Sequence, residues 1–163
     1  MACIYPSPEW LEGGFKAFQA DPKWENKLKK LSGHFAYRIQ ADEAFGLDKD
    51  LYMCMVLDAG KLTRLEHVTE EDAKRDADFL LGATPQVWKR ILQKLDKFVG
   101  AFMGRRIKLE KGSTVGALAL GPHAGTLVDV LTLVELQFPD DLSPDEFGGF
   151  KSKLDDFRAS KGL

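Results

Sequence analysis

Three histidines and two pairs of adjacent carboxylates are the side chains best suited to catalysis in this sequence. His34, His67 and His123 have no nucleophile, base or further ligand at the spacing of a zinc or catalytic-triad motif. Asp140-Asp141 and Asp155-Asp156 stand in polar contexts, and a general acid needs an apolar setting that raises its pKa. The sequence therefore predicts neither a metal site nor an acid–base pair.

The segment Gly112-Ser113-Thr114-Val115-Gly116 invites comparison with two functional loops but matches neither. A nucleophile elbow has its serine third of five residues, and here the serine stands second. A phosphate-binding loop has Gly-Lys followed by Ser or Thr four residues after its first glycine, and that spacing does not occur here. We interpret Gly112 as a strand exit and Ser113 as a helix cap, and we expect no cofactor.

Composition and charge narrow the class of partner. Hydrophobic residues make up 44% of the chain and charged residues 29%, and the formal net charge of −2 comes from acids and bases mixed along its length. Nucleic-acid-binding domains usually gather Lys and Arg on one face and have a pI well above neutral, so we exclude that class. The basic run from Arg105 to Lys108 provides transient membrane contact at most, at about 1 kcal/mol per basic residue near an anionic bilayer.

Signals for secretion or membrane insertion are weak. Residues 1–8 lack the basic and apolar regions of a signal peptide. The longest apolar stretch, residues 115–136, contains Pro122, Asp129 and Glu135, which argue against a membrane span. Cys3 and Cys54 are too few for a disulfide framework, and we expect Cys54 to be buried. These observations predict a cytoplasmic protein.

Helix-start signals recur along the chain. A capping residue followed by proline occurs at Ser7-Pro8, Asp21-Pro22, Thr84-Pro85 and Ser143-Pro144. Glu146 adds the third-position acid of a capping box to the last of these. We also expect Asp96 to cap a short helix that ends at Gly104, and Gly121-Pro122 to interrupt an apolar helix that begins after Gly112.

Strand signals predict the fold class. Apolar alternation or continuous apolar runs indicate strands at residues 34–40, 51–57, 62–67, 77–81 and 106–110. Residues 51–57 are apolar on both faces, which predicts a strand covered on both sides. The sequence therefore predicts a single α+β domain over residues 1–163, with a five-stranded, mostly antiparallel sheet and helices packed on one face. Residues 121–163 are expected to form a helical C-terminal extension.

Residues 76–120 resemble the sterol carrier protein type two family in the order of elements and in short motifs. The matching pieces are Ala77-Asp78-Phe79, Trp88-Lys89-Arg90-Ile91-Leu92, Lys94-Leu95-Asp96, Ala101-Phe102-Met103-Gly104, Ile107-Lys108-Leu109-Glu110-Lys111-Gly112 and Gly116-Ala117-Leu118-Ala119-Leu120. The sequence departs from the family at Lys97, where an Asp/Asn-Pro turn usually has proline. Less specific similarity extends the resemblance over most of residues 7–120.

The resemblance implies a five-stranded α/β layer that carries lipids non-covalently in a tunnel between helices and sheet. Family ligands include sterols, fatty acids, fatty acyl-CoA and phospholipids, and no catalytic residue comes with the resemblance. By position, the helix after the fifth strand lines the tunnel, which places Val115, Leu118 and Ala119 near the ligand. Further candidates are apolar residues expected to face the interior, or apolar residues beyond those that one sheet face needs. These are Phe79, Leu81, Trp88, Ile91, Phe98, Phe102, Leu127 and Leu131.

Three functions stay open at this point. The leading hypothesis is a carrier whose partner is a fatty acid, fatty acyl-CoA or sterol-like molecule. The second is a solid-cored interaction domain without ligand, in which residues 121–163 form a homodimer interface. The third is an enzyme acting on a lipid-like substrate through Ser113, His123 or Asp129. Residues 121–163, the tail, can cover the tunnel, fill it with their own side chains or pair with a second copy of the chain. The sequence does not distinguish among these three arrangements.

Overall fold

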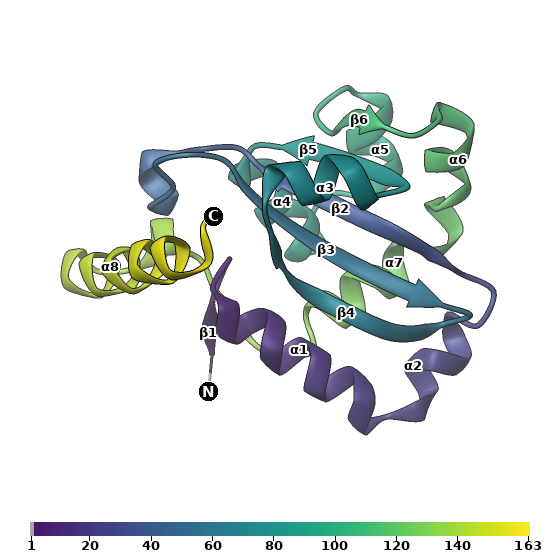
Figure 1. Ribbon diagram of the computed structural model, residues 1–163, viewed down its shortest axis with the longest axis horizontal. Helices are drawn as coiled ribbons and strands as arrows, with labels where there is room; N and C mark the ends of the chain where they lie inside the picture. Colours follow the sequence, from purple (N-terminus) through teal and green to yellow (C-terminus); the bar gives the residue numbers. More distant parts are fainter. Residues whose placement is uncertain (1) are drawn as a thin grey trace.

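A five-stranded mixed sheet organises the computed structural model, which describes residues 2–163. The strands lie in the order β4-β3-β2-β5-β6 (Figure 1). Only β2 and β5 pair in parallel, and the other neighbours are antiparallel. The bounds are β2 Gly33–Ile39, β3 Leu51–Asp58, β4 Lys61–Val68, β5 Phe79–Ala83 and β6 Lys108–Lys111. The predicted α+β class with a mostly antiparallel sheet is confirmed.

The helices connect and cover these strands. Their bounds are α1 Pro8–Ala20, α2 Pro22–Lys27, α3 Glu70–Asp76, α4 Pro85–Leu92, α5 Phe98–Met103, α6 Thr114–Ala119, α7 Gly121–Leu131 and α8 Pro144–Lys161. Two short 3-10 turns, η1 Glu43–Phe45 and η2 Pro139–Asp141, complete the connections. A small second sheet pairs β1 (Cys3–Ile4) in parallel with β7 (Leu136–Gln137). Within residues 2–163, no helix is both long enough and apolar enough to cross a membrane.

Most of the predicted helix starts are confirmed. The side chains of Ser7, Asp21, Thr84 and Ser143 each accept a hydrogen bond from a backbone N–H in the first turn of their helix. The predicted role of Asp96 is wrong, because Lys97 occupies the N-cap of α5 without a side-chain bond. The Asp96 carboxylate lies instead 2.7 Å from Arg90 Nε and 3.2 Å from Arg106 Nη1. Two guanidinium groups therefore attract this carboxylate in place of the helix terminus.

The two faces of the sheet are covered differently. On one face Phe35, Ile39 and Met53 belong to the main core, to which α1, α4, α5 and α7 also contribute. On the other face α3 buries Tyr52 and Cys54, so it is the exception to the predicted one-sided helical layer (Figure 1). The expectation that β3 is covered on both sides is thereby confirmed.

The last 43 residues, 121–163, pack against the rest of the chain through α7, β7, η2 and α8. Helix α7 contacts α1, α4 and α5, and β7 pairs with β1. Helix α8 buries Phe150 and Leu154 in the main core. Its Arg158 guanidinium donates to the carbonyls of Lys49 at 2.9 Å and Asp50 at 2.6 Å. These contacts hold α8 against the connection that precedes β3.

Candidate apolar binding site

A small apolar cavity lies where the main face of the sheet meets α1, α4 and α7. Its volume is about 50 Å³. Aromatic and aliphatic side chains form its wall, namely Tyr5, Trp10, Tyr37, Ile39, Met53, Trp88, Ile91, Leu92 and Leu131. Burial raises the pKa of both Tyr5 and Tyr37, so their phenol groups stay neutral. The wall of the cavity therefore carries no charge and is suited to apolar groups of a ligand.

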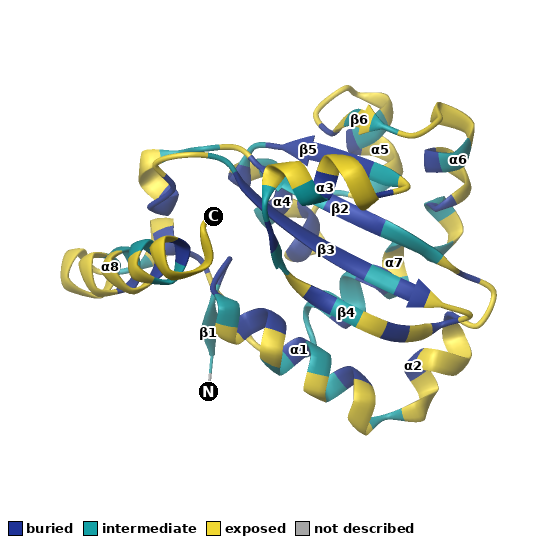
Figure 2. Cartoon of the chain, in the orientation of Figure 1, coloured by how far each residue is buried: buried dark blue, intermediate teal, exposed yellow. Residues whose placement is uncertain are grey.

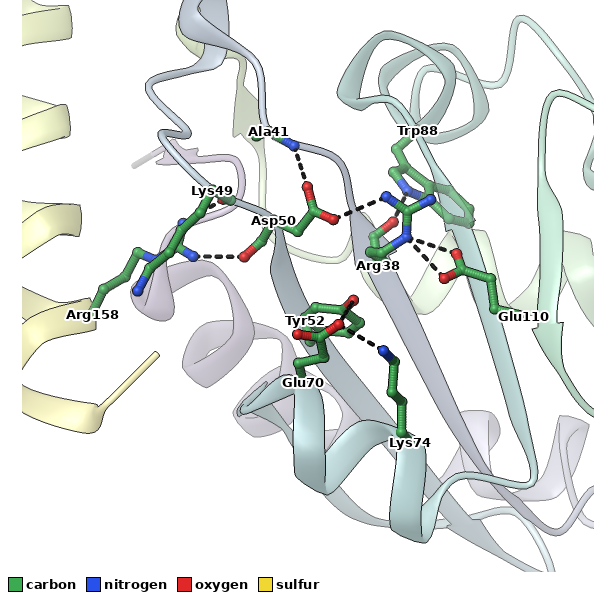
Figure 3. Close-up of polar contacts among 10 residues, drawn as sticks. All are labelled: Arg38, Ala41, Lys49, Asp50, Tyr52, Glu70, Lys74, Trp88, Glu110 and Arg158. Carbon is green, nitrogen blue, oxygen red and sulfur yellow. Dashed lines mark hydrogen bonds and ion pairs between the residues drawn. The ribbon is translucent and has the colours of Figure 1, made fainter.

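Two tryptophans are held in fixed positions around the cavity. Trp88 Nε1 donates to the carbonyl oxygen of Arg38 at 3.0 Å (Figure 3). The Trp88 ring meets that of Tyr37 edge-on, with centroids 5.7 Å apart. Trp10 Nε1 donates to the carbonyl oxygen of Leu131 at 2.8 Å. Because both indole N–H groups are used in these bonds, neither is free to bind a ligand.

The wall is assembled from segments far apart in the sequence. Helix α4 presents Trp88, Ile91 and Leu92 on one side, at the spacing of a helix face. Strands β2 and β3 present alternate residues on the same sheet face. The pairing of β1 with β7 brings Tyr5 close to Phe138, with ring centroids 5.5 Å apart, and the Tyr5 ring also lies 5.0 Å from that of Trp10. Cavity formation thus depends on contacts between the N-terminal strand, the sheet and the tail.

The size of the cavity decides what it can hold in this structure. Binding pockets for small molecules usually measure about 300–1,000 Å³, and a water molecule takes about 30 Å³ of liquid. At about 50 Å³ the cavity has room for roughly two methylene groups, so an alkyl tail fits only if the walls separate. Around this void, the side chains of the sheet and helices interlock.

Helix α7 contributes few fully buried side chains to the packing around the cavity. It buries only Leu127 and Val130, and its N-terminus has no side-chain cap. It is separated from α6 by the break at Gly121-Pro122. Few buried contacts are typical of segments that open at low free-energy cost. Movement of α7 away from the sheet is therefore the simplest way to enlarge the cavity.

The structure brings only part of the predicted site together. Trp88, Ile91 and Leu131 line the cavity. The other predicted residues of the sheet and helices pack in or against the main core but do not line the cavity. These are Phe79, Leu81, Phe98, Phe102 and Leu127. The rings of Phe98 and Phe102 stack on each other with centroids 5.8 Å apart.

The three residues placed by the resemblance on the helix after β6 lie at the surface. Val115 is 80% exposed, Leu118 is 37% exposed, and Ala119 is also exposed, whereas Ala117 points inward. Helix α6 lies so close to β5 that a Cβ atom on Gly116 would stand 2.6 Å from the ring of Phe79. Only small residues fit on the inner side of α6, so its larger side chains face away from the cavity.

Several wall residues were not predicted as site residues. Tyr5, Trp10, Tyr37, Ile39, Met53 and Leu92 line the cavity although the sequence singled out none of them for binding. Periodicity placed Tyr37 and Ile39 on the same face of their strand as Phe35, which was the available signal. Periodicity alone does not show which of the inward-facing residues border a cavity.

The candidate catalytic side chains do not converge. Ser113 Oγ accepts a hydrogen bond from the backbone N–H of Gly116 at 3.0 Å and so caps α6, as expected. Asp129 pairs with Lys94 Nζ at 2.8 Å. No hydrogen bond joins either residue to His123 within the described part of the chain. Residues 2–163 also contain no group of three His, Cys, Asp or Glu residues that could hold a metal ion.

A polar cluster occupies the opposite face of the sheet (Figure 3). Arg38 Nε lies 3.0 and 2.7 Å from the two carboxylate oxygens of Glu110, and Arg38 Nη1 lies 3.1 Å from Asp50. Nearby, Glu70 accepts from Tyr52 at 3.2 Å and from Lys74 at 2.7 Å. Each carboxylate in this cluster has a partner, so the cluster ties β2, β3, β6 and α3 together.

Comparison with known proteins supports the fold and leaves the function open. Neither protein-family models nor curated sequences match the chain. Among solved structures, a conserved hypothetical protein of Thermus thermophilus, described as possibly a sterol carrier protein, is 20% identical with a TM-score of 0.67 over 80% of this chain and 90% of its own. Sterol carrier protein 2 is 18% identical with a TM-score of 0.62 over 84% and 98%. Apo sterol carrier protein 2 from Yarrowia lipolytica is 16% identical with a TM-score of 0.54 over 76% and 88%.

These similarities define the class of fold. The chain adopts the sterol carrier protein type two fold, as its residues 76–120 predicted, with α8 as an extra C-terminal helix. At such low identities the similarity concerns architecture alone.

Proposed function

We propose that this protein binds a lipid-like molecule non-covalently between its sheet and helices α1, α4 and α7. The observation that carries the proposal is the uncharged, aromatic-walled cavity at this junction. The fold supports it, because two of the similar structures are sterol carrier proteins. A fatty acid, a fatty acyl-CoA or a sterol-like molecule is the proposed class of ligand. Carriage of this ligand, without chemical change, is the proposed activity.

The free energy available from a long alkyl chain is large enough to open the cavity. Each buried methylene contributes about 0.8 kcal/mol, so a sixteen-carbon chain offers roughly 12 kcal/mol before ordering costs. Separating α7 from the sheet exposes chiefly Leu127, Val130 and Leu131, at about 1.5–3 kcal/mol each. That cost is an upper bound, because these side chains repack against the ligand. An eight-carbon chain offers roughly 6 kcal/mol gross, which lies within the range of that cost and leaves little surplus after ordering costs.

The proposal therefore predicts a dependence on chain length. Delipidated protein titrated with a fluorescent sixteen-carbon fatty acid should bind it, and unlabelled sixteen-carbon acid should displace it. The eight-carbon acid should displace it poorly. Absence of displaceable binding at micromolar protein would contradict the proposal.

A cavity-filling variant tests the location of the ligand. Leu131→Phe places a ring in a void with room for roughly two methylene groups, so binding should weaken about 15-fold, equivalent to about 1.6 kcal/mol. Leu95→Phe is the matched control, because Leu95 is 60% exposed and lies outside the wall. Equal effects of the two substitutions would place the ligand elsewhere.

The setting that we propose is cytoplasmic. The thiols of Cys3 and Cys54 are both free, and Cys54 is buried. Unpaired cysteines are usual in proteins of a reducing compartment.

A second candidate function is a ligand-free interaction domain, which the small size of the cavity favours. In that case the interlocked core is complete by itself, and a tail surface joins two copies. Light scattering combined with lipid extraction separates the candidates. A dimer that retains no small molecule and takes up no fatty acid supports the interaction domain.

A further inference from the structure

Helices α5 and α6 expose apolar side chains at one end of the molecule. On α5, Val99 is 39% and Met103 is 65% exposed, and on α6, Val115 is 80% and Leu118 is 37% exposed. Residues three or four apart lie on the same side of a helix, so each helix presents a pair. Leu95, in the connection before α5, adds a fifth side chain at 60% exposure. We call these five residues the apolar tip.

The two helices belong to one surface region. Both contact α7, and Figure 2 shows their exposed sides at the same end of the molecule, next to β6. Val99 lies against Gly121, the first residue of α7 and two residues beyond α6, because a Cβ atom on Gly121 would stand 3.0 Å from Val99 Cγ2. Large apolar side chains gathered in this way are typical of surfaces that meet another apolar phase.

The charge around the apolar tip is opposite to that of the remaining chain. Residues 94–120 contain six Lys and Arg against two Asp and Glu, a net charge of +4, and the total of −2 leaves −6 for the other residues. Both acids are neutralised, because Asp96 pairs with Arg90 and Arg106 and Glu110 pairs with Arg38.

Three basic side chains of this region are available to a partner. Lys97, Arg105 and Lys108 are exposed, and none of them forms an ion pair within residues 2–163. They flank the tip in sequence, with Lys97 directly before α5 and Arg105 two residues after Met103. A positive end on an acidic protein orients the molecule toward a negative surface.

We propose that the apolar tip docks on an anionic membrane surface. Met103 and Val115 enter the interfacial layer, and Lys97, Arg105 and Lys108 face the lipid phosphates. Interfacial binding combines buried apolar area with attraction between basic side chains and anionic lipids, and this region supplies both. The inner side of α5 continues into the core through Ala101 and Phe102, so docking brings the bilayer close to the helical layer. The proposal goes beyond ligand binding and does not require it.

Vesicle co-sedimentation tests the electrostatic part. The protein should bind phosphatidylcholine vesicles containing about 30% phosphatidylserine, and bind pure phosphatidylcholine much more weakly. Each basic residue contributes about fivefold to this binding, so the triple variant K97Q/R105Q/K108Q should lose roughly 100-fold. The control K16Q/K29Q/K30Q makes the same change in net charge at exposed lysines outside residues 94–120 and should change binding by less than about threefold. Equal losses in the two triple variants would overturn the proposal.

The apolar part is tested by M103Q/V115Q, which should weaken vesicle binding while leaving circular dichroism and fatty-acid titration in solution unchanged. If the wild-type protein binds anionic vesicles but no fatty acid, the result contradicts the proposed ligand binding and leaves membrane docking intact. Wild type that ignores anionic vesicles overturns membrane docking. Membrane docking is also overturned if the wild type forms a concentration-dependent dimer and M103Q/V115Q dissociates that dimer without changing vesicle binding. The apolar tip would then be an interface between two copies of the chain.

Discussion

The acid sensitivity of the fold should depend on His67, a residue of β4 enclosed by α8. Its ring packs edge-on against Phe157 at a centroid distance of 5.6 Å. Both ring nitrogens are buried and lack a hydrogen-bond partner within residues 2–163. Burial lowers the pKa of His67 to about 4, with the Pro6 carbonyl opposing this shift and the positive charge of Arg158 adding to it. The folded protein therefore keeps this ring neutral.

The pH dependence follows from the difference between the folded and unfolded chains. An unfolded histidine has a pKa of about 6.5, so below that pH the unfolded chain takes up a proton that the folded chain refuses. The contribution of neutral His67 is complete above about pH 6.5 and is lost as the pH falls toward 4. A difference of about 2.5 pKa units at 1.36 kcal/mol each corresponds to about 3 kcal/mol of unfolding free energy.

Urea unfolding of wild type, His67→Leu and His67→Gln measures this loss. Tryptophan fluorescence reports the transition at about pH 7.5 and about pH 4. Because all other groups titrate alike in the three proteins, the variants should gain about 3 kcal/mol relative to wild type between the two pH values. The two variants differ in size and polarity, so only the pH-dependent part should be common to them. Parallel pH profiles for wild type and both variants would refute the reasoning.

Three further substitutions test local contacts. Arg158→Met leaves the carbonyls of Lys49 and Asp50 without their donor and should cost about 2–3 kcal/mol in urea unfolding. Ser143→Ala removes the Ser143 half of the capping box of α8 and should cost about 1 kcal/mol, with faster amide exchange at Glu146. Trp10→Phe removes the donor to the Leu131 carbonyl and should cost about 1 kcal/mol, with faster amide exchange along α7.

For each of these three substitutions, one result would contradict the role given to the contact that it removes. For Arg158→Met it is an unchanged urea midpoint. For Ser143→Ala it is unaltered exchange at Glu146. For Trp10→Phe it is a loss of stability confined to α1, with exchange in α7 as slow as in wild type.

Local signals were sufficient for most of the fold. Helix starts at Ser7, Thr84 and Ser143 were predictable because a cap acts on backbone groups within three residues of it. The double coverage of β3 was predictable because its apolar residues alternate to both sides. Asp96 failed as a cap because its carboxylate responds to Arg106, ten residues further on, which a reading of the helix start alone does not include.

The lining of the candidate site depends on packing that no local pattern determines. Trp88 and Ile91 could be placed on an inner face because a helical stripe identifies one. Tyr5 was missed because it reaches the cavity through the pairing of β1 with β7, across most of the chain. The exposure of Val115 was not predictable, because α6 has only six residues and the close approach of Gly116 to Phe79 determines which side faces inward.

Native mass spectrometry of the delipidated protein after incubation with a sixteen-carbon fatty acid tests the central proposal most directly. We predict a peak heavier than the bare chain by one ligand mass, reduced in Leu131→Phe and retained in Leu95→Phe. The bare mass alone, under conditions that keep the chain folded, would contradict ligand binding in this cavity.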